Sequence, residues 1–217
     1  MNIPNLISML RVFMIPLFLY LILMDSKTMK ILGLVVFALA SLTDLIDGWS
    51  ARKLKQESEF GKFLDPLADK ILVVSGLCSF LLLDALIPIW MIIVIIGRDV
   101  LITVLRYCAI QKGSSLRTSH FGKVKTAFQM ISIVLIIMII IVRGSKISLP
   151  ADFVSDSYFY SALQVVMSDN PKKWLIAGPY WIMLFVTIVT AWSGLRYLMF
   201  NWKFLLPPYK NKAVDAK

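Results

Sequence analysis

Long apolar stretches separated by short polar connections run through the chain. Six of these stretches are long enough to form membrane helices, because about 20 apolar residues in a helix cross a hydrocarbon core of roughly 30 Å. They are residues 6–24, 31–51, 65–86, 88–110, 124–142 and 174–198. The stretches lack the polar face that a surface helix of a soluble domain shows. The pattern therefore predicts an all-α integral membrane protein, a bundle of six transmembrane helices that forms a single domain over residues 1–217.

The distribution of Lys and Arg predicts the orientation of this bundle. An even number of spans places both termini on one side, and the connections on that side together with the tail hold twelve Lys and Arg against six on the other side. Positively charged connections stay in the cytoplasm, so we expect both termini there. The formal net charge of +10 fits this topology and contact with anionic lipid. No basic helix with interleaved aromatic residues lies outside the apolar stretches, so nucleic acid is not an expected partner.

Two further features are predicted to be structural. The longest connection on the outer side, residues 143–173, carries several aromatic residues, and such residues are typical of a segment at the level of the lipid headgroups. Cys78 and Cys108 lie inside apolar stretches without the spacing of metal ligands. We expect both cysteines to be buried as small hydrophobic side chains.

Four aspartates gather at the cytoplasmic ends of two consecutive predicted helices. Asp44 and Asp47 are three residues apart near the end of the second stretch, so they share a helix face. Asp65 and Asp69, four residues apart at the start of the third stretch, also share a face. An ionised Asp inside a membrane helix costs about 2.5–3.5 kcal/mol, so the cluster must face a polar cavity, a partner or a cation. Carboxylates without His or Cys favour Mg²⁺ or Mn²⁺, and four suit two ions about 3.5–4 Å apart.

Small and basic residues accompany the aspartates at fixed spacing. Gly48, Ala51 and Gly61 leave room either for a flat group beside the helices or for close helix packing. Arg52 can donate two parallel hydrogen bonds to phosphate oxygens. The order is Asp44-x-x-Asp47-Gly48-x-x-Ala51-Arg52, eight residues, Gly61-x-x-x-Asp65-x-x-x-Asp69. At every defined position this order resembles the signature of the CDP-alcohol phosphatidyltransferases.

The resemblance implies a transferase of the bacterial inner membrane with its active site at the cytoplasmic face. It implies that Asp44, Asp47 and Asp65 bind one Mg²⁺ or Mn²⁺, and that Asp65 and Asp69 bind a second. It also implies that Asp69 is the general base that takes the proton of the attacking alcohol. The residues that would contact the CDP-lipid, CDP-diacylglycerol, are Asn5, Gly48, Ala51, Arg52 and Gly61. The family further implies a homodimer in contact with membrane lipid.

Basic residues of the later stretches bear on the identity of the acceptor. Several Arg and Lys around a polar cavity suit a phosphorylated acceptor. The residues predicted to bind that phosphate are Arg98, Arg106, Arg117, Lys123, Lys125 and Arg196. The stretches around Arg98 and around Lys123 resemble those of bacterial phosphatidylglycerophosphate synthases, which implies glycerol-3-phosphate as the acceptor. Phosphatidylglycerol, serine and inositol phosphate stay open as alternatives, and Arg98 with Asp99 has a second interpretation as an internal ion pair.

A membrane transporter is the alternative class of protein. Transporters also place charged side chains inside membrane helices. They do not require a Gly, an Ala and an Arg at fixed spacing after Asp47, nor the gathering of all four carboxylates at one boundary. The sequence therefore favours the enzyme, and release of CMP from CDP-diacylglycerol would discriminate the two.

Overall fold

The fold is seen in a computed structural model, which describes residues 3–54, 59–111, 121–144, 158–168 and 170–201. Side chains are described for residues 9–43, 68, 70–109, 111, 126–144, 158–168 and 170–201. Within these ranges the chain forms seven α-helices and no strand. The prediction of an all-α protein is therefore confirmed.

The helices follow the apolar stretches of the sequence. They are α1 (Ile3–Leu23), α2 (Lys27–Leu54), α3 (Glu59–Leu83), α4 (Ile89–Gln111), α5 (Phe121–Arg143), α6 (Tyr158–Met167) and α7 (Lys173–Phe200). The largest difference from the predicted boundaries is at α3, which begins at Glu59 instead of residue 65. Asp65 and Asp69 therefore lie inside this helix and not in its first turn. Helix α6 lies within the connection of residues 143–173, which was predicted to lie at the level of the lipid headgroups.

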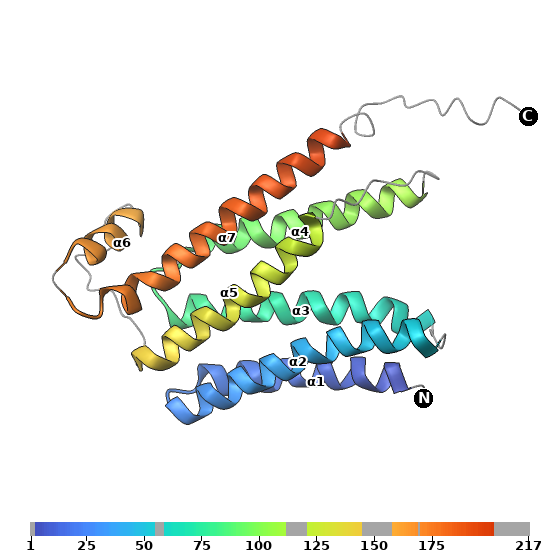
Figure 1. Cartoon of the computed structure of the whole chain (residues 1–217), viewed down its shortest axis with the longest axis horizontal. Helices are drawn as coiled ribbons and strands as arrows, with labels where there is room; N and C mark the ends of the chain where they lie inside the picture. The colour runs from blue at the N-terminus through green and yellow to red at the C-terminus, as the bar shows by residue number, and fades with distance from the viewer. Residues whose placement is uncertain (1–2, 55–58, 112–120, 145–157, 169, 202–217) are drawn as a thin grey trace, which may run out of the picture.

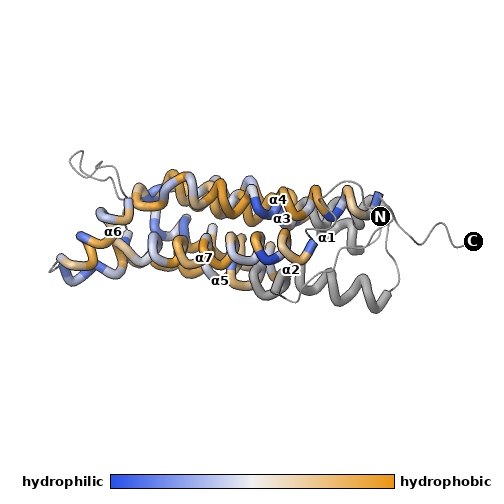
Figure 2. The backbone as a smooth tube through the Cα atoms, turned by 90° about the horizontal axis from the view of Figure 1, so that it is seen from above, coloured by the Kyte–Doolittle hydropathy of each residue, from blue (hydrophilic) through white to orange (hydrophobic). Residues whose placement is uncertain are grey.

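Two groups of helices lie side by side (Figure 1, Figure 2). Helix α1 packs along α2 and α3, whereas α7 packs along α4, α5 and α6. Helix α5 also contacts α2 and α3, so it joins the two groups. Helices α1 and α3 begin at one end of the molecule, and α2, α4 and α7 end there (Figure 1). We call this the terminal end and the opposite one the far end.

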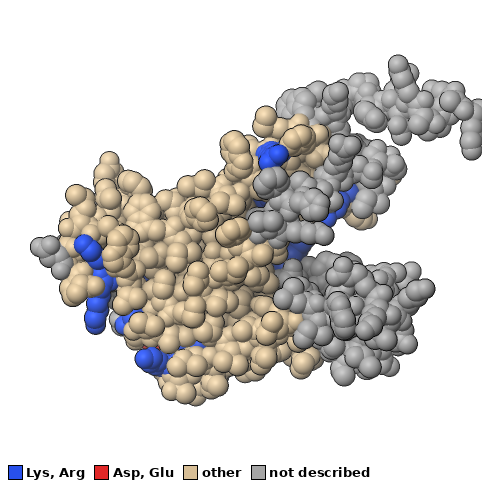
Figure 3. Space-filling view, in the orientation of Figure 1, with Lys and Arg blue, Asp and Glu red and all other residues tan. Residues whose placement is uncertain are grey.

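The outer surface of the helices is mostly apolar. Phe13, Phe185 and Trp192 are exposed although they lie within helices, and apolar residues dominate the middle of the helices in Figure 2. On the face shown in Figure 3, the visible Lys and Arg side chains lie toward the two ends of an uncharged belt. Two helical segments in the described part of the chain are long and apolar enough to cross a membrane, Thr126–Arg143 and Lys173–Phe200, and Met9–Leu23 and Lys70–Leu83 are shorter apolar segments.

Helix α6 lies against α7 at the far end (Figure 1). Its buried residues are Ser161 and Ala162. The ring of Phe159 meets Trp181 of α7 edge to face, with 5.7 Å between the ring centroids. Tyr160 is exposed, so the helix carries aromatic side chains on its outer side. Its position at the level of the headgroups stays a prediction.

The two cysteines do not lie in the core. Cys78 of α3 and Cys108 of α4 are both free and exposed, so the prediction that they are buried is wrong. An apolar stretch of sequence does not distinguish a side chain that faces another helix from one that faces outward, because both faces of a membrane helix are apolar.

Candidate active site

The four aspartates lie on the two helices that were predicted to carry them. Asp44 and Asp47 belong to α2, and Asp65 and Asp69 belong to α3. Their side chains lie outside the described residues. The described residues nearby nevertheless give the relative height of the two helices to about one turn and the face that each turns to the interior of the bundle.

A close approach at Gly76 gives the register between α2 and α3. A Cβ added at Gly76 would lie 3.3 Å from Cε2 of Phe37, so these two residues lie within about one helical turn of each other along the bundle. The helices run in opposite directions (Figure 1), so the step from 37 to 44 along α2 matches the step from 76 back to 69 along α3. At about 1.5 Å per residue, Asp44 and Asp69 each lie roughly 10 Å from this contact toward the terminal end, so their heights agree within about one turn.

The buried faces of both helices lead to the same positions. Gly33, Phe37 and Ala40 are buried on α2, and continuing their spacing of three and four residues leads to both aspartates of that helix. Leu72 and Gly76 are buried on α3, and the same spacing toward the start of the helix leads to its two aspartates. Each acidic pair therefore continues the face that its helix turns to the interior of the bundle.

The residue types at this level are suited to hard divalent cations. Carboxylate oxygens prefer Mg²⁺ or Mn²⁺, and no Cys or His of the sequence lies between residues 44 and 69. The described side chains themselves form no group of three or more acidic, His or Cys ligands. The four aspartates have the ligand chemistry that such a cation requires.

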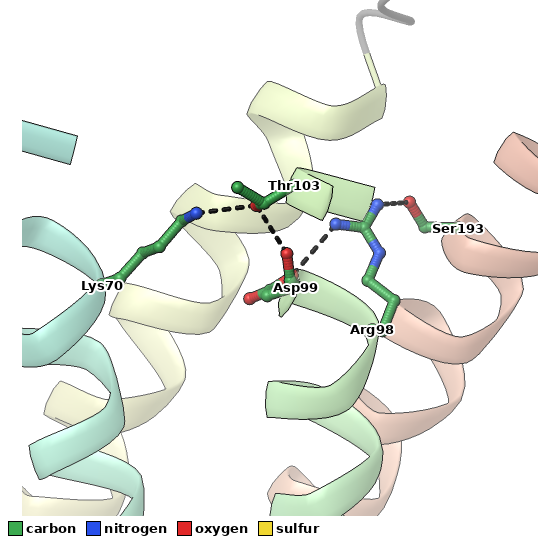
Figure 4. A network of polar contacts seen from close by, with 5 residues as sticks. All are labelled: Lys70, Arg98, Asp99, Thr103 and Ser193. Carbon is green, nitrogen blue, oxygen red and sulfur yellow. Dashed lines mark hydrogen bonds and ion pairs between the residues drawn. The ribbon is translucent and has the colours of Figure 1, made fainter. Parts of the chain in front are cut away.

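A network of polar contacts connects α3, α4 and α7 next to these positions (Figure 4). The ammonium group of Lys70 donates a hydrogen bond of 2.7 Å to the hydroxyl of Thr103. That hydroxyl donates in turn to the backbone carbonyl of Asp99, also at 2.7 Å. Because Lys70 follows the second aspartate of α3 directly in the sequence, the network joins the two groups of helices beside the candidate site.

Arg98 is the centre of the second half of this network. Its Nη1 lies 3.0 Å from Oδ1 of Asp99, and its Nη2 donates a hydrogen bond of 2.8 Å to Ser193 of α7. The internal ion pair with Asp99, one of the two sequence interpretations, is therefore present. Nε of Arg98 is buried and makes no hydrogen bond within the described part of the chain. Asp99 and Ser193 thus hold the guanidinium in place.

Gly194 allows α7 to pack directly against Arg98. A Cβ added at Gly194 would lie 2.9 Å from Cγ of Arg98, and this atom is too close to the backbone to move without turning the whole side chain. We expect Gly194→Ala to displace the guanidinium from Ser193 and to lower the free energy of unfolding by about 1–3 kcal/mol. Thermal unfolding in detergent measures the change.

Gly178→Ala in the same helix is the matched control. Among the described residues, a Cβ added at Gly178 would meet only Cδ1 of Ile139, at the ordinary distance of 3.6 Å. Because Ala is the better helix former, we expect no loss of stability at this position. Equal destabilisation by both substitutions would mean that close packing against Arg98 is not the cause.

The other predicted acceptor residues are only partly described. Arg106 of α4 is exposed, and it lies about one turn beyond Thr103, the partner of Lys70, toward the terminal end. Arg196 of α7 is also exposed, with its Cζ 5.5 Å from the centroid of the Phe200 ring. The predicted site residues whose side chains lie outside the described residues are Asn5, Gly48, Ala51, Arg52, Gly61, Arg117, Lys123 and Lys125.

Sequence reasoning missed a buried ion pair at the far end. Nη1 of Arg143, at the end of α5, lies 2.8 Å from Oδ2 of Asp84, and the side chains are only 4% and 0% exposed. Oδ1 of Asp84 accepts a hydrogen bond from the backbone N–H of Leu86. Asp84 was given no role, and Arg143 was counted as a loop cation. The available signal was that two opposite charges lie at the same predicted membrane boundary.

Comparison with known proteins identifies the family. The model described as "CDP-alcohol phosphatidyltransferase" matches residues 1–167. The chain belongs to the CDP-alcohol phosphatidyltransferase family, an enzyme family of transferases. The resemblance drawn from the spacing of the aspartates is therefore confirmed, and a membrane protein is what this family and the apolar helices indicate.

Several relatives resemble the chain over most of its length. It is 32% identical to the CDP-diacylglycerol–glycerol-3-phosphate 3-phosphatidyltransferase of Bacillus subtilis (strain 168), over 94% of this chain and 97% of that protein. It is 33% identical to the protein of the same name from Pseudomonas fluorescens, over 94% of this chain and 92% of that protein. It is 35% identical to a probable phosphatidylglycerophosphate synthase of Mycobacterium tuberculosis (strain ATCC 25618 / H37Rv), over 63% of this chain and 66% of that protein.

Proposed function

We propose that the protein transfers the phosphatidyl group of CDP-diacylglycerol to glycerol-3-phosphate, which forms phosphatidylglycerophosphate and releases CMP. The observation that carries the proposal is the register of α2 and α3, in which Asp44 and Asp69 are equally many residues away from the contact between Phe37 and Gly76. The names of the relatives from Bacillus subtilis and Pseudomonas fluorescens support the choice of both substrates.

In the proposed reaction the aspartates have two roles, metal binding and proton transfer. Asp44, Asp47 and Asp65 hold one Mg²⁺ or Mn²⁺, and Asp65 with Asp69 holds a second. When bound, the ions supply positive charge against the diphosphate and the departing CMP. Asp69 takes the proton of the glycerol hydroxyl. The hydroxyl oxygen then bonds to the phosphorus of the phosphatidyl group, and the bond between this phosphorus and CMP breaks. Asn5, Gly48, Ala51, Arg52 and Gly61 line the CDP-lipid site.

Basic side chains bind the phosphate of the acceptor. Arg98 supports this role best, because Asp99 and Ser193 fix its guanidinium and its side chain is still 15% exposed. Charge-assisted hydrogen bonds from Arg to phosphate are short and strong. Arg106 follows Thr103, the partner of Lys70, by about one turn of α4. The remaining members of the proposed phosphate site are Arg117, Lys123, Lys125 and Arg196.

The proposal includes the arrangement in the membrane. The helices other than α6 form six spans of one domain over residues 1–217, with both termini and the active site on the cytoplasmic side of a bacterial inner membrane. The excess of Lys and Arg in the connections at the terminal end supports this orientation. Following the family resemblance, the protein acts as a homodimer surrounded by lipid.

An acceptor assay tests the proposal. Purified protein in detergent receives CDP-diacylglycerol and Mg²⁺, and release of CMP is followed with glycerol-3-phosphate, serine, inositol phosphate or phosphatidylglycerol. We expect glycerol-3-phosphate to be used at least about 100-fold better than serine, because a site built for phosphate leaves its charged donors unpaired with an acceptor that lacks one. Removal of the metal with EDTA should stop the reaction.

The assay tests the identity of the acceptor separately from the class of reaction. Release of CMP with serine or phosphatidylglycerol alone would show that the acceptor is wrong while the reaction class is right. No release of CMP with any acceptor in the presence of Mg²⁺ or Mn²⁺ would contradict the enzyme assignment for this chain.

A further inference from the structure

Arg11 is a buried arginine that the proposed reaction does not use. Its side chain is only 1% exposed although it lies in α1, a helix without any other charged residue. It continues the inner face of that helix, which Ile15, Phe18 and Ile22 form at a spacing of three and four residues. Charged side chains inside membrane helices face the interior of the bundle and pair there. Arg11 does interact with other residues, and its position on α1 shows which one is within reach.

Two close contacts fix the register between α1 and α2. The rings of Phe18 and Phe37 lie with their centroids 5.2 Å apart. A Cβ added at Gly33 would lie 3.2 Å from the backbone nitrogen of Ile22. The helices run in opposite directions (Figure 1), and a step from 22 to 18 on α1 matches a step from 33 to 37 on α2, so the register is the same at both contacts.

Continuing this register places Arg11 opposite an aspartate of the candidate site. The step from 18 to 11 along α1 matches the step from 37 to 44 along α2. Midway between, Ile15 and Ala40 are level by the same count, and both are buried. Arg11 and Asp44 therefore occupy facing positions on the inner faces of the two helices.

We propose that Arg11 is a positioning residue that pairs with Asp44 and holds it in the cluster before any metal binds. The role rests on the proposed function, in which Asp44 is a metal ligand. Four carboxylates gathered near the ends of two neighbouring helices repel one another, and a guanidinium among them offsets part of that repulsion. Its planar fork also fixes the orientation of a carboxylate that accepts two parallel hydrogen bonds. Helix α1 packs along both α2 and α3, so the positive charge of Arg11 can lie beside the aspartates of both helices.

A thermodynamic cycle in EDTA tests the pairing without metal or substrate. The melting temperature is measured in detergent for the wild type, Arg11→Met, Asp44→Asn and the double variant. Breaking a buried pair should lower the melting temperature by about 6–20 °C when Arg11→Met is made in the protein that keeps Asp44. In the Asp44→Asn background the same substitution should lower it by less than half as much, because the partner charge is already gone. An equal shift in both backgrounds would overturn the pairing.

Asp47→Asn provides the matched background. It removes the same charge one turn further along α2, so Arg11→Met should keep most of its effect there. An equal reduction in the Asp44→Asn and Asp47→Asn backgrounds would show a general charge effect and overturn the assignment to Asp44. If Arg11→Met does not fold, Arg11→Lys replaces it in the same cycle, since Lys keeps the charge but loses the fork.

The cycle stands apart from the test of the proposed function. Titration of the wild type with Mn²⁺, followed by electron paramagnetic resonance, reports whether the aspartates bind metal. Coupling between Arg11 and Asp44 without Mn²⁺ binding would leave the pairing intact and overturn the metal site. Mn²⁺ binding without coupling between Arg11 and Asp44 would support the metal site and overturn the pairing.

Discussion

Replacing Asp69 by Asn is expected to lower kcat by about 10²–10⁴-fold while CDP-diacylglycerol still binds. Asn has nearly the shape of Asp and keeps one oxygen that can face a cation, but it does not accept the proton of the attacking hydroxyl. The nucleotide is held mainly by other residues in the proposal, so its affinity should change much less than the rate. Release of CMP gives the rate, and equilibrium binding of a CDP-lipid gives the affinity.

Asp25→Asn is the control for this experiment. Asp25 is an exposed residue of the connection between α1 and α2 at the far end, so the same chemical change there should leave both turnover and binding near the wild-type values. Equal losses of CDP-lipid binding and turnover in Asp69→Asn would remove the assignment of the general base. The residue would then act chiefly as a metal ligand.

The positions of the main helices could be predicted from the sequence because each apolar stretch is about as long as a helix that crosses a membrane. The start of α3 could not, because the residues from Glu59 to Lys62 are largely polar and an apolar pattern does not show a helix that extends beyond its apolar part. Helix α6 is short and lies in a connection, so its helical form depends on packing against α7. Such packing is decided by residues distant in sequence.

The aspartate motif could be recognised because its chemistry is local. Each acidic pair lies within one turn of one helix, and spacing alone puts such residues on one face. Contacts between helices follow a different rule. Ser193 lies 95 residues after Arg98, and Asp84 lies 59 residues before Arg143. Nothing in the sequence alone shows which of several apolar helices pack together, so these partners became visible only in the folded chain.

Breaking the ion pair between Asp84 and Arg143 is expected to destabilise the protein by about 3–5 kcal/mol, because the remaining charge stays buried without its partner. Asp84→Asn is the cleanest change, since the amide oxygen can still accept the hydrogen bond from the N–H of Leu86. Arg143→Met, which keeps an extended apolar side chain, should have an effect of similar size. Thermal or denaturant unfolding in detergent measures both.

The double variant decides whether the pair itself carries the effect. With Asp84→Asn and Arg143→Met combined, no unpaired charge remains, so the loss of stability should be well below the sum of the two single losses. Lys27→Met removes an exposed cation at the same end and should change the stability by no more than about 0.5 kcal/mol. Losses that add in the double variant would contradict the pairing. Below their melting temperatures the variants should keep the wild-type rate of CMP release, because the pair lies at the opposite end of α3 from the aspartates.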